Sequence, residues 1–301
     1  MATVHFIRGK GNPPPFRDIY EEVRWIEFVY YPGQSMESRL EILRNTSRHY
    51  PFSIYKTHKN PPEFNIRDDA FYIVKTRNPI DALASLVPFL RNHLPGFAKM
   101  WGGFPASAGE TEKPEAMIEY EKFIFEDIGS GKSGLDALIL DPILGFWEFR
   151  NKSNLLFLHY TDRIKDHKGQ IARIAKFLGV DLTSEELNLV AENTDFKAMK
   201  RDASKYNLAH IFDAFRGPDK VPDFVTTMLS PNVLVNKGPE RDANAVLPAH
   251  FIEKAKRAIL DKTGPKIYKW LMEGGEFPAD SELQQVSLVH NKTRLPQNSA
   301  K

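Results

Sequence analysis

Two short stretches of this sequence combine residue types that suit group transfer with an anionic ligand. In the first, Lys56 and His58 end an apolar run two positions apart, so on an extended strand they lie on the same face. An imidazole can take the proton from an attacking hydroxyl, and an ammonium can stabilise charge on a leaving oxygen. The pair therefore predicts a site for acid–base chemistry, although a single histidine is more often structural.

The second stretch combines an arginine with a hydroxyl. Arg77 directly follows the apolar segment 71–76, and Ser85 lies eight residues further on, about two helical turns into the next element. A guanidinium fork with a hydroxyl near the start of a helix suits a phosphate ester. On spacing alone, an ordinary surface arginine and an unrelated helix serine explain the pattern equally well.

The flanking sequence predicts the elements that position these residues. Ile, Val, Tyr and Phe are frequent in 52–57 and 70–76, which predicts two strands. Asn78 is a suitable N-cap, Pro79 suits the first helical position, and apolar residues recur at helical spacing over 79–94. An open α/β sheet binds phosphorylated ligands at such strand ends and helix N-termini.

The rest of the chain continues this alternation. A buried strand is expected at 154–160, and irregular structure is expected at 95–118 and 206–245. Strands that alternate with helices predict a mainly parallel sheet flanked by helices in a single α/β domain, residues 1–280, followed by a polar tail, 281–301. Further helices are expected over about 136–150, in the segment that ends at Gly179, over 184–193 and over 248–272.

Composition excludes several classes of function. The absence of cysteine excludes disulfides, thiolate catalysis and cysteine-based zinc sites. A net charge of +2 is too small to indicate nucleic-acid binding. No apolar run approaches the ~18 residues of a membrane helix, and the N-terminus lacks the apolar core of a signal peptide. We therefore expect a cytoplasmic protein that uses no metal and binds neither nucleic acid nor a membrane.

In combination, the motifs resemble the cytosolic sulfotransferase family. Lys56-Thr57-His58 and Arg77-Asn78-Pro79-x-Asp81-x-x-x-Ser85 are similar to two of its motifs. Further matches follow in the family's order at 145–148, 154–162, 194–200 and 236–238, and the resemblance covers about residues 25–272. It implies a sulfotransferase fold of the P-loop-NTPase-like type.

The family transfers a sulfuryl group from 3′-phosphoadenosine 5′-phosphosulfate to a hydroxyl or amine of a small molecule. The resemblance implies that His58 is the catalytic base and that Lys56 stabilises the sulfuryl transition state. By the same resemblance, the 3′-phosphate and the adenine of the donor would be bound by Arg77, Ser85, Tyr160, Thr194, Phe196, Lys237 and Gly238. Within this set, Tyr160, Thr194 and Phe196 would line the adenine site.

The chain departs from the family near its N-terminus. The family's loop Tyr-Pro-Lys-Ser-Gly-Thr-Thr-Trp, which wraps the 5′-phosphosulfate, has no counterpart here. The stretch 129–134 has a Gly-Lys-Ser core, but Glu126 stands where a phosphate loop needs its first glycine, so a surface turn is expected. Two explanations stay open: the chain is a fragment or natural truncation, or its first 25 residues fold differently and compensate.

Two functions also stay open. The chain is either a sulfotransferase or a catalytically impaired protein of the same fold that binds adenosine 3′,5′-bisphosphate. The family's short dimer motif has no clean match, which leaves a monomer or a weak dimer. Phe97, Trp101 and Phe104 suggest an apolar or aromatic acceptor, but they are equally consistent with the packing of a lid.

Overall fold

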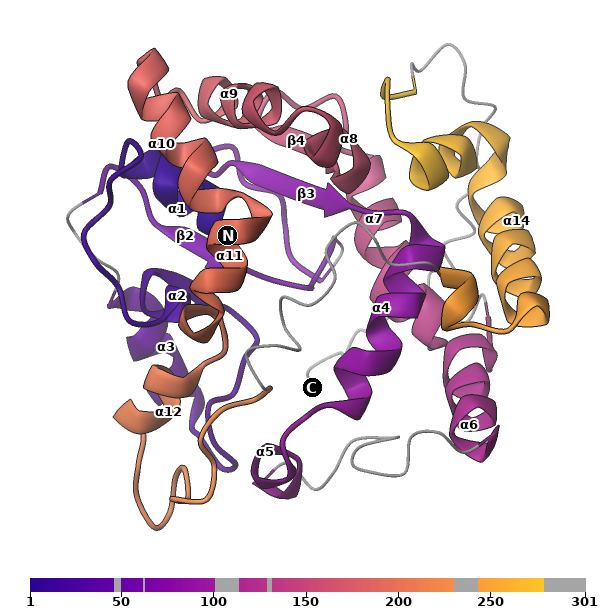
Figure 1. Ribbon diagram of the computed structural model, residues 1–301, viewed down its shortest axis with the longest axis horizontal. Helices are drawn as coiled ribbons and strands as arrows, with labels where there is room; N and C mark the ends of the chain where they lie inside the picture. Colours follow the sequence, from indigo (N-terminus) through magenta and orange to yellow (C-terminus); the bar gives the residue numbers. More distant parts are fainter. Residues whose placement is uncertain (46–49, 62, 101–113, 129–131, 230–242, 279–301) are drawn as a thin grey trace, which may run out of the picture.

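The computed structural model describes residues 1–45, 50–61, 63–100, 114–128, 132–229 and 243–278 (Figure 1). Most of the chain in these ranges is helical, with short strands between the helices. In chain order the helices and strands are α1 (Ala2–Arg8), α2 (Ile19–Glu22), β1 (Val23–Trp25), α3 (Met36–Arg44), β2 (Ile54–Lys56), β3 (Tyr72–Thr76), α4 (Pro79–Arg91), α5 (Pro95–Met100), α6 (Pro114–Phe125), α7 (Asp141–Trp147), β4 (Leu155–His159), α8 (Tyr160–Lys165), α9 (His167–Phe177), α10 (Ser184–Thr194), α11 (Phe196–Arg201), α12 (Ala209–Ala214) and α14 (Ala249–Glu273).

The strands form two parallel pairs. β1 pairs with β2, which places Trp25 opposite Lys56, and β3 pairs with β4, which places Thr76 opposite His159. Within the described ranges no ladder joins the two pairs. The expectation of a single α/β domain with parallel strands is confirmed, although the strands do not form one continuous sheet there.

The β3–β4 pair lies between two apolar layers because its residues alternate between faces. Val74 and Phe157 face the core that α4, α7 and α14 cover. Ile73 and Leu156 face the opposite way and pack in the cluster formed with α1, α9 and α10. Helices on both faces of the pair hold the carboxyl ends of β3 and β4 in place, and Arg77 and Tyr160 follow directly at those ends (Figure 1).

Phe251 of α14 is fully buried in the larger core. Its ring is stacked on Tyr120 with centroids 5.6 Å apart, and it lies 4.7 Å from the ring of Phe125. We expect Phe251→Ala to lower the free energy of unfolding by about 3–5 kcal/mol, because it removes these contacts and leaves a cavity. Leu260→Ala, on the same helix but 39% exposed, should cost about 1 kcal/mol or less. Urea unfolding of both variants measures the difference, and equal losses would contradict the role of Phe251.

The N-terminal segment folds in a way that the sequence did not predict. Residues Ala2–Arg8 form α1, which lies against α10 and α9. Ile7 is fully buried there, and Arg8 pairs with Glu22 at 2.7 Å across the connection to α2. These contacts hold α1 against α9 and α10 and connect it to α2.

Most of the other predicted elements are confirmed with small shifts. The strands expected at 52–57, 70–76 and 154–160 are β2, β3 and β4, and Asn78 caps α4 by accepting a hydrogen bond from the N–H of Ile80 at 2.9 Å. The helix expected at 136–150 is a π-helical turn, Asp136–Leu140, followed by α7.

Two expectations of irregular structure are wrong in part. Within 95–118, Pro95–Met100 and the start of α6 are helical, because Phe97 and Ala98 bury an apolar face that drives helix formation. Within 206–245, α12 forms around the buried residues Ile211 and Phe212. Trp101 and Phe104 lie outside the described residues, whereas Phe97 is packed on Phe212 and stacked on His93, as lid packing requires. None of the described helices is long and apolar enough to cross a membrane.

Candidate functional site

Trp25 brings Lys56 and His58 together. The register of β1 and β2 sets Trp25 beside Lys56, and the Lys56 Nζ lies 3.5 Å from the centre of the indole. The ring of His58 meets the same indole edge-on, with centroids 5.0 Å apart. The rings of Phe28 and Tyr20 also stack on the indole, with centroids 4.6 and 5.8 Å away. One aromatic scaffold thus positions both predicted catalytic groups.

The aromatic surroundings of Lys56 destabilise its ammonium group. Burial among the aromatic rings lowers the pKa of Lys56 to about 8, and the charge of Glu27 only partly opposes this effect. The Nζ donates a hydrogen bond to the Tyr20 hydroxyl at 3.3 Å and has no ion pair among the described residues. The ammonium is therefore poorly solvated by protein groups and available to a negatively charged ligand.

Glu27 orients His58. Its Oε1 accepts a hydrogen bond from the backbone N–H of His58 at 2.5 Å and lies 3.2 Å from Nδ1 of the ring. Partial burial raises the pKa of Glu27, but the bonds from His58 outweigh this effect and bring the pKa to about 2, so the carboxylate is charged. A carboxylate at Nδ1 keeps the proton on that nitrogen and leaves Nε2 free to accept one. The His58 side chain is 62% exposed, which leaves room for a substrate.

Arg77 and Ser85 are in direct contact. Arg77 directly follows β3, and Ser85 lies on the second turn of α4. This placement lets the Nη1 of Arg77 donate a hydrogen bond to the Ser85 hydroxyl at 2.9 Å. Asn78, between them, accepts from the first N–H groups of the helix and donates to the Met272 carbonyl at 3.0 Å. The N-terminus of α4 is thereby fixed next to a guanidinium and a hydroxyl, a combination that suits a phosphate.

Tyr160 brings a second strand end to this place. It begins α8 directly after β4, and its ring centre lies 5.2 Å from the Cζ of Arg77 and 5.3 Å from the Nζ of Lys75. The preceding His159 is buried and structural: its Nε2 lies 3.0 Å from the Leu271 carbonyl, and its Nδ1 accepts from the N–H of Thr161 at 3.2 Å. His159 therefore has no free nitrogen for proton transfer.

Arg163, on α8 with Tyr160, contacts Thr194, another residue expected at the adenine site. Its Nη2 donates to the Thr194 carbonyl at 2.9 Å, so the end of α10 lies against α8. The Thr194 hydroxyl donates to the Val190 carbonyl at 2.7 Å and is buried, while Phe196 at the start of α11 is 38% exposed. Lys237 and Gly238 lie outside the described residues.

Three cations act on the amino group at the start of α1. Burial, followed by the charges of Lys75, Arg163 and Lys56, lowers the pKa of the Met1 amino group to about 5. Among the described residues, no three His, Asp or Glu side chains gather as a metal site requires.

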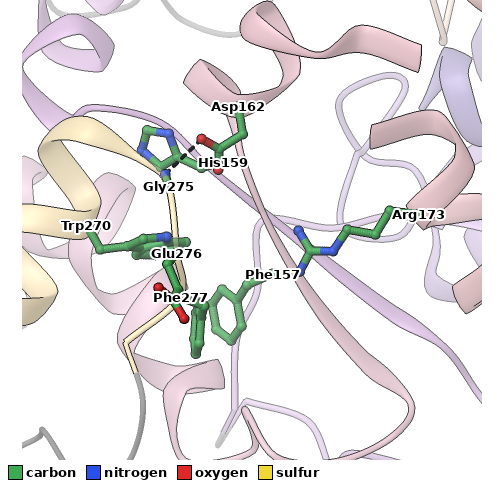
Figure 2. Close-up of a pocket in the computed structure, with 8 residues that line it drawn as sticks. All are labelled: Phe157, His159, Asp162, Arg173, Trp270, Gly275, Glu276 and Phe277. Atoms are coloured by element: carbon green, nitrogen blue, oxygen red, sulfur yellow. Dashed lines mark hydrogen bonds between the residues drawn. The ribbon is translucent and has the colours of Figure 1, made fainter. Parts of the chain in front are cut away.

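His159 is one of the residues that line a separate pocket (Figure 2). It holds about 240 Å³ and is walled by the rings of Phe157, Trp270 and Phe277. The chain turns into it at Gly274, where φ is 73° and a Cβ would lie 2.7 Å from the His159 ring, so only glycine fits. None of the residues predicted for the catalytic or donor site lines this pocket.

Known proteins resemble this chain in sequence and in fold. Residues 5–214 match the model of the sulfotransferase domain. This chain belongs to the sulfotransferase family. Sulfotransferase 2A6 of Mus musculus is 28% identical over 212 residues, which are 69% of this chain and 64% of the relative. Sulfotransferase 2A1 of Homo sapiens is 30% identical over 194 residues, or 64% of this chain and 58% of the relative.

A third relative of this sulfotransferase-family chain is a 3-alpha-hydroxysteroid sulfotransferase of Cavia porcellus, 29% identical over 201 residues, or 66% of this chain and 60% of the relative. The matched region thus spans less than two thirds of the length of these relatives. Two solved structures share the fold. Mouse sulfotransferase SULT7A1 complexed with PAP has a TM-score of 0.56 at 19% identity, covering 90% of this chain and 84% of that chain. Retinol dehydratase in complex with androsterone and PAP has a TM-score of 0.55 at 16% identity, and the match covers 93% of this chain and 79% of that chain.

Sequence reasoning missed four residues that shape the site: Trp25, Glu27, Lys75 and Arg163. Trp25 and Glu27 lie 31 residues before Lys56 and His58, in a segment whose strand is only three residues long. A carboxylate in the otherwise apolar run 25–31 was the available signal for Glu27, since a charge in such a run needs a partner. Lys75, inside a predicted strand, was a comparable signal.

Proposed function

We propose that this protein transfers a sulfuryl group from 3′-phosphoadenosine 5′-phosphosulfate to a hydroxyl of a small molecule. The observation that carries the proposal is the convergence of His58 and Lys56 on Trp25, with Glu27 at the Nδ1 of His58. A base that has one nitrogen free, next to an ammonium that has no ion pair among the described residues, suits transfer between two oxygens. Membership of the sulfotransferase family supports the choice of a sulfuryl group.

The donor would lie across the ends of β3 and β4. Arg77 and Ser85 would bind its 3′-phosphate, with Lys237 and Gly238 as further ligands. Tyr160 and Phe196 would contact the adenine, and Thr194 would line the same site. The direct Arg77–Ser85 contact and the position of Tyr160 over Arg77 support this placement. PAP in the two similar solved structures supports a donor of this type.

In the reaction we propose, the acceptor oxygen attacks the sulfur while the bond from sulfur to the 5′-phosphate oxygen breaks. The acceptor proton passes to Nε2 of His58, and Lys56 stabilises the charge on the transferring group. The products are the sulfated acceptor and adenosine 3′,5′-bisphosphate. Such a transfer depends chiefly on in-line positioning and charge stabilisation, which the fixed Lys56–Trp25–His58 arrangement would provide.

The acceptor we propose is a hydroxylated apolar molecule. Relatives of this chain include hydroxysteroid sulfotransferases, and a similar structure holds androsterone. The aromatic rings around His58, Trp25 and Phe28, are consistent with an apolar partner next to the base. A cytoplasmic location and a monomer or weak dimer remain predictions.

Two measurements test this function. Calorimetric titration with adenosine 3′,5′-bisphosphate should release heat with a single site, and incubation with labelled donor and a panel of hydroxysteroids, phenols and amines should give a labelled product. Absence of binding at millimolar nucleotide would refute the donor site. Binding without transfer to any acceptor would favour a second function, a bisphosphate-binding protein without turnover. The lack of a match to the family's phosphosulfate loop favours that alternative.

The rate of transfer should depend on the charge of Lys56. Burial lowers the pKa of Lys56 to about 8, so the ammonium loses its proton as the pH rises through this value. We expect kcat/KM to fall above about pH 8 for this reason. Lys56→Arg should be slower but should keep its activity at high pH, because a guanidinium stays protonated up to about pH 12. The pH profiles of kcat/KM for the two proteins test this prediction. An identical decline in both would show that a group other than Lys56 causes it.

A further inference from the structure

Lys75 is a cation next to the proposed donor site, and the proposed chemistry gives it no role. It lies on β3 two residues before Arg77, opposite Leu158 of β4, so both side chains emerge on the same face. Both approach the Tyr160 ring, at 5.3 Å for Lys75 and 5.2 Å for Arg77. The side chain of Lys75 makes no hydrogen bond or ion pair within the described part of the chain.

Lys75 belongs to a group of cations without paired carboxylates. Arg163 lies one helical turn beyond Tyr160 and is bonded to the Thr194 carbonyl and, at 3.4 Å, to the Nδ1 of His167. Neither Lys75, Arg163, Arg77 nor Lys56 has an ion pair among the described residues. Desolvation, together with the charges of Arg163 and Arg77, lowers the pKa of Lys75 to about 8.

Such a group of like charges is unfavourable unless a ligand supplies the opposite charge. The charge of Arg77 acts on Asp81, and the charge of Glu27 acts on Lys56, but neither carboxyl group forms an ion pair with these cations among the described residues. A polyanion is therefore the ligand that this cluster fits.

The order of groups along the donor identifies which anion Lys75 would meet. The 3′-phosphate, the ribose, the 5′-phosphate and the sulfuryl group follow one another in the molecule. With the 3′-phosphate at Arg77 and the sulfuryl group at Lys56, the 5′-phosphate falls between them. Lys75 adjoins the Arg77 end of this path, because both side chains approach the Tyr160 ring.

We propose that Lys75, assisted by Arg163, binds the 5′-phosphate of the donor; this inference rests on the proposed function. The sequence has no match to the family's lysine-bearing phosphosulfate loop, and the described elements offer other cations for the 5′-phosphate. Lys75 and Arg163 supply them from β3 and α8.

The test compares two nucleotides that differ only at the 5′ position. Lys75→Met keeps the length of the side chain but removes its charge. We expect it to weaken binding of adenosine 3′,5′-bisphosphate about 10- to 100-fold, as loss of one charge-assisted bond implies, and to leave the affinity for adenosine 3′-monophosphate unchanged. Lys75→Arg should keep most of the affinity. The control is Lys176→Met, an exposed lysine on α9, which should bind both nucleotides as the wild type does.

The outcomes separate this inference from the function on which it rests. If the wild type binds the bisphosphate and Lys75→Met binds it equally well, the role of Lys75 is refuted while the donor site stands. Equal losses for both nucleotides also refute it, because Lys75 would then not act on the 5′-phosphate. If the wild type binds neither nucleotide, both the inference and the proposed donor site are refuted.

Discussion

His58→Ala is expected to lower the rate of sulfuryl transfer by about 10²- to 10⁴-fold, the usual contribution of a general base. The affinity for adenosine 3′,5′-bisphosphate should not change, because His58 lies on the acceptor side and contacts none of the proposed donor ligands. The fold should also be unaffected, since the side chain is 62% exposed and its removal leaves no buried cavity. Single-turnover rates with labelled donor measure the loss.

A second histidine offers a matched control. His250 is 67% exposed and pairs with Glu121 at 3.1 Å, much as His58 pairs with Glu27. His250→Ala should therefore transfer at the wild-type rate. A rate for His58→Ala within a few-fold of the wild type would exclude His58 as the base.

Glu27→Gln tests whether the carboxylate positions that base. Glutamine can still accept the backbone hydrogen bond of His58, but it cannot stabilise the protonated ring. We expect kcat to fall by less than in His58→Ala, with the bisphosphate affinity and KM for the donor unchanged. A change in the donor KM as large as the change in kcat would instead indicate a general distortion of the β1–β2 region.

Arg77→Met is expected to weaken binding of adenosine 3′,5′-bisphosphate by at least about 100-fold. The guanidinium can make two charge-assisted hydrogen bonds to one phosphate, and each is worth about 1.5–3 kcal/mol. The Ser85 hydroxyl would remain but would lose the Nη1 group that contacts it at 2.9 Å. Calorimetric titration gives the dissociation constants directly.

The comparison of nucleotides makes this prediction specific. Adenosine 5′-monophosphate lacks the 3′-phosphate, so Arg77→Met should bind it as the wild type does. Arg77→Lys should show an intermediate loss, because an ammonium keeps the charge without the planar fork. The control is Arg173→Met, an exposed arginine at the separate pocket, which should have no effect on either nucleotide. If Arg77→Met lost affinity for both nucleotides equally, the 3′-phosphate assignment would be wrong.

The N-terminal segment shows where local sequence signals fail. Helix α1 has no side-chain cap and is only seven residues long, so it is too short to be stable by itself. Burial of Ile7 against α9 and α10 supplies the missing stability, and α10 lies more than 170 residues away in the chain. No pattern within residues 2–8 reports on that contact.

The sequence alone determined the parts of the site that depend on near neighbours. The apolar run of β3, the Asn78 cap and the periodicity of α4 lie within a few residues of one another, and together they bring Arg77 to Ser85. Only the tertiary structure decided the contacts of Trp25, Glu27 and Lys75, because these depend on strand register and on helices packed from distant segments. Register fixes which side chains stand opposite each other, and periodicity along one strand carries no information about its partner.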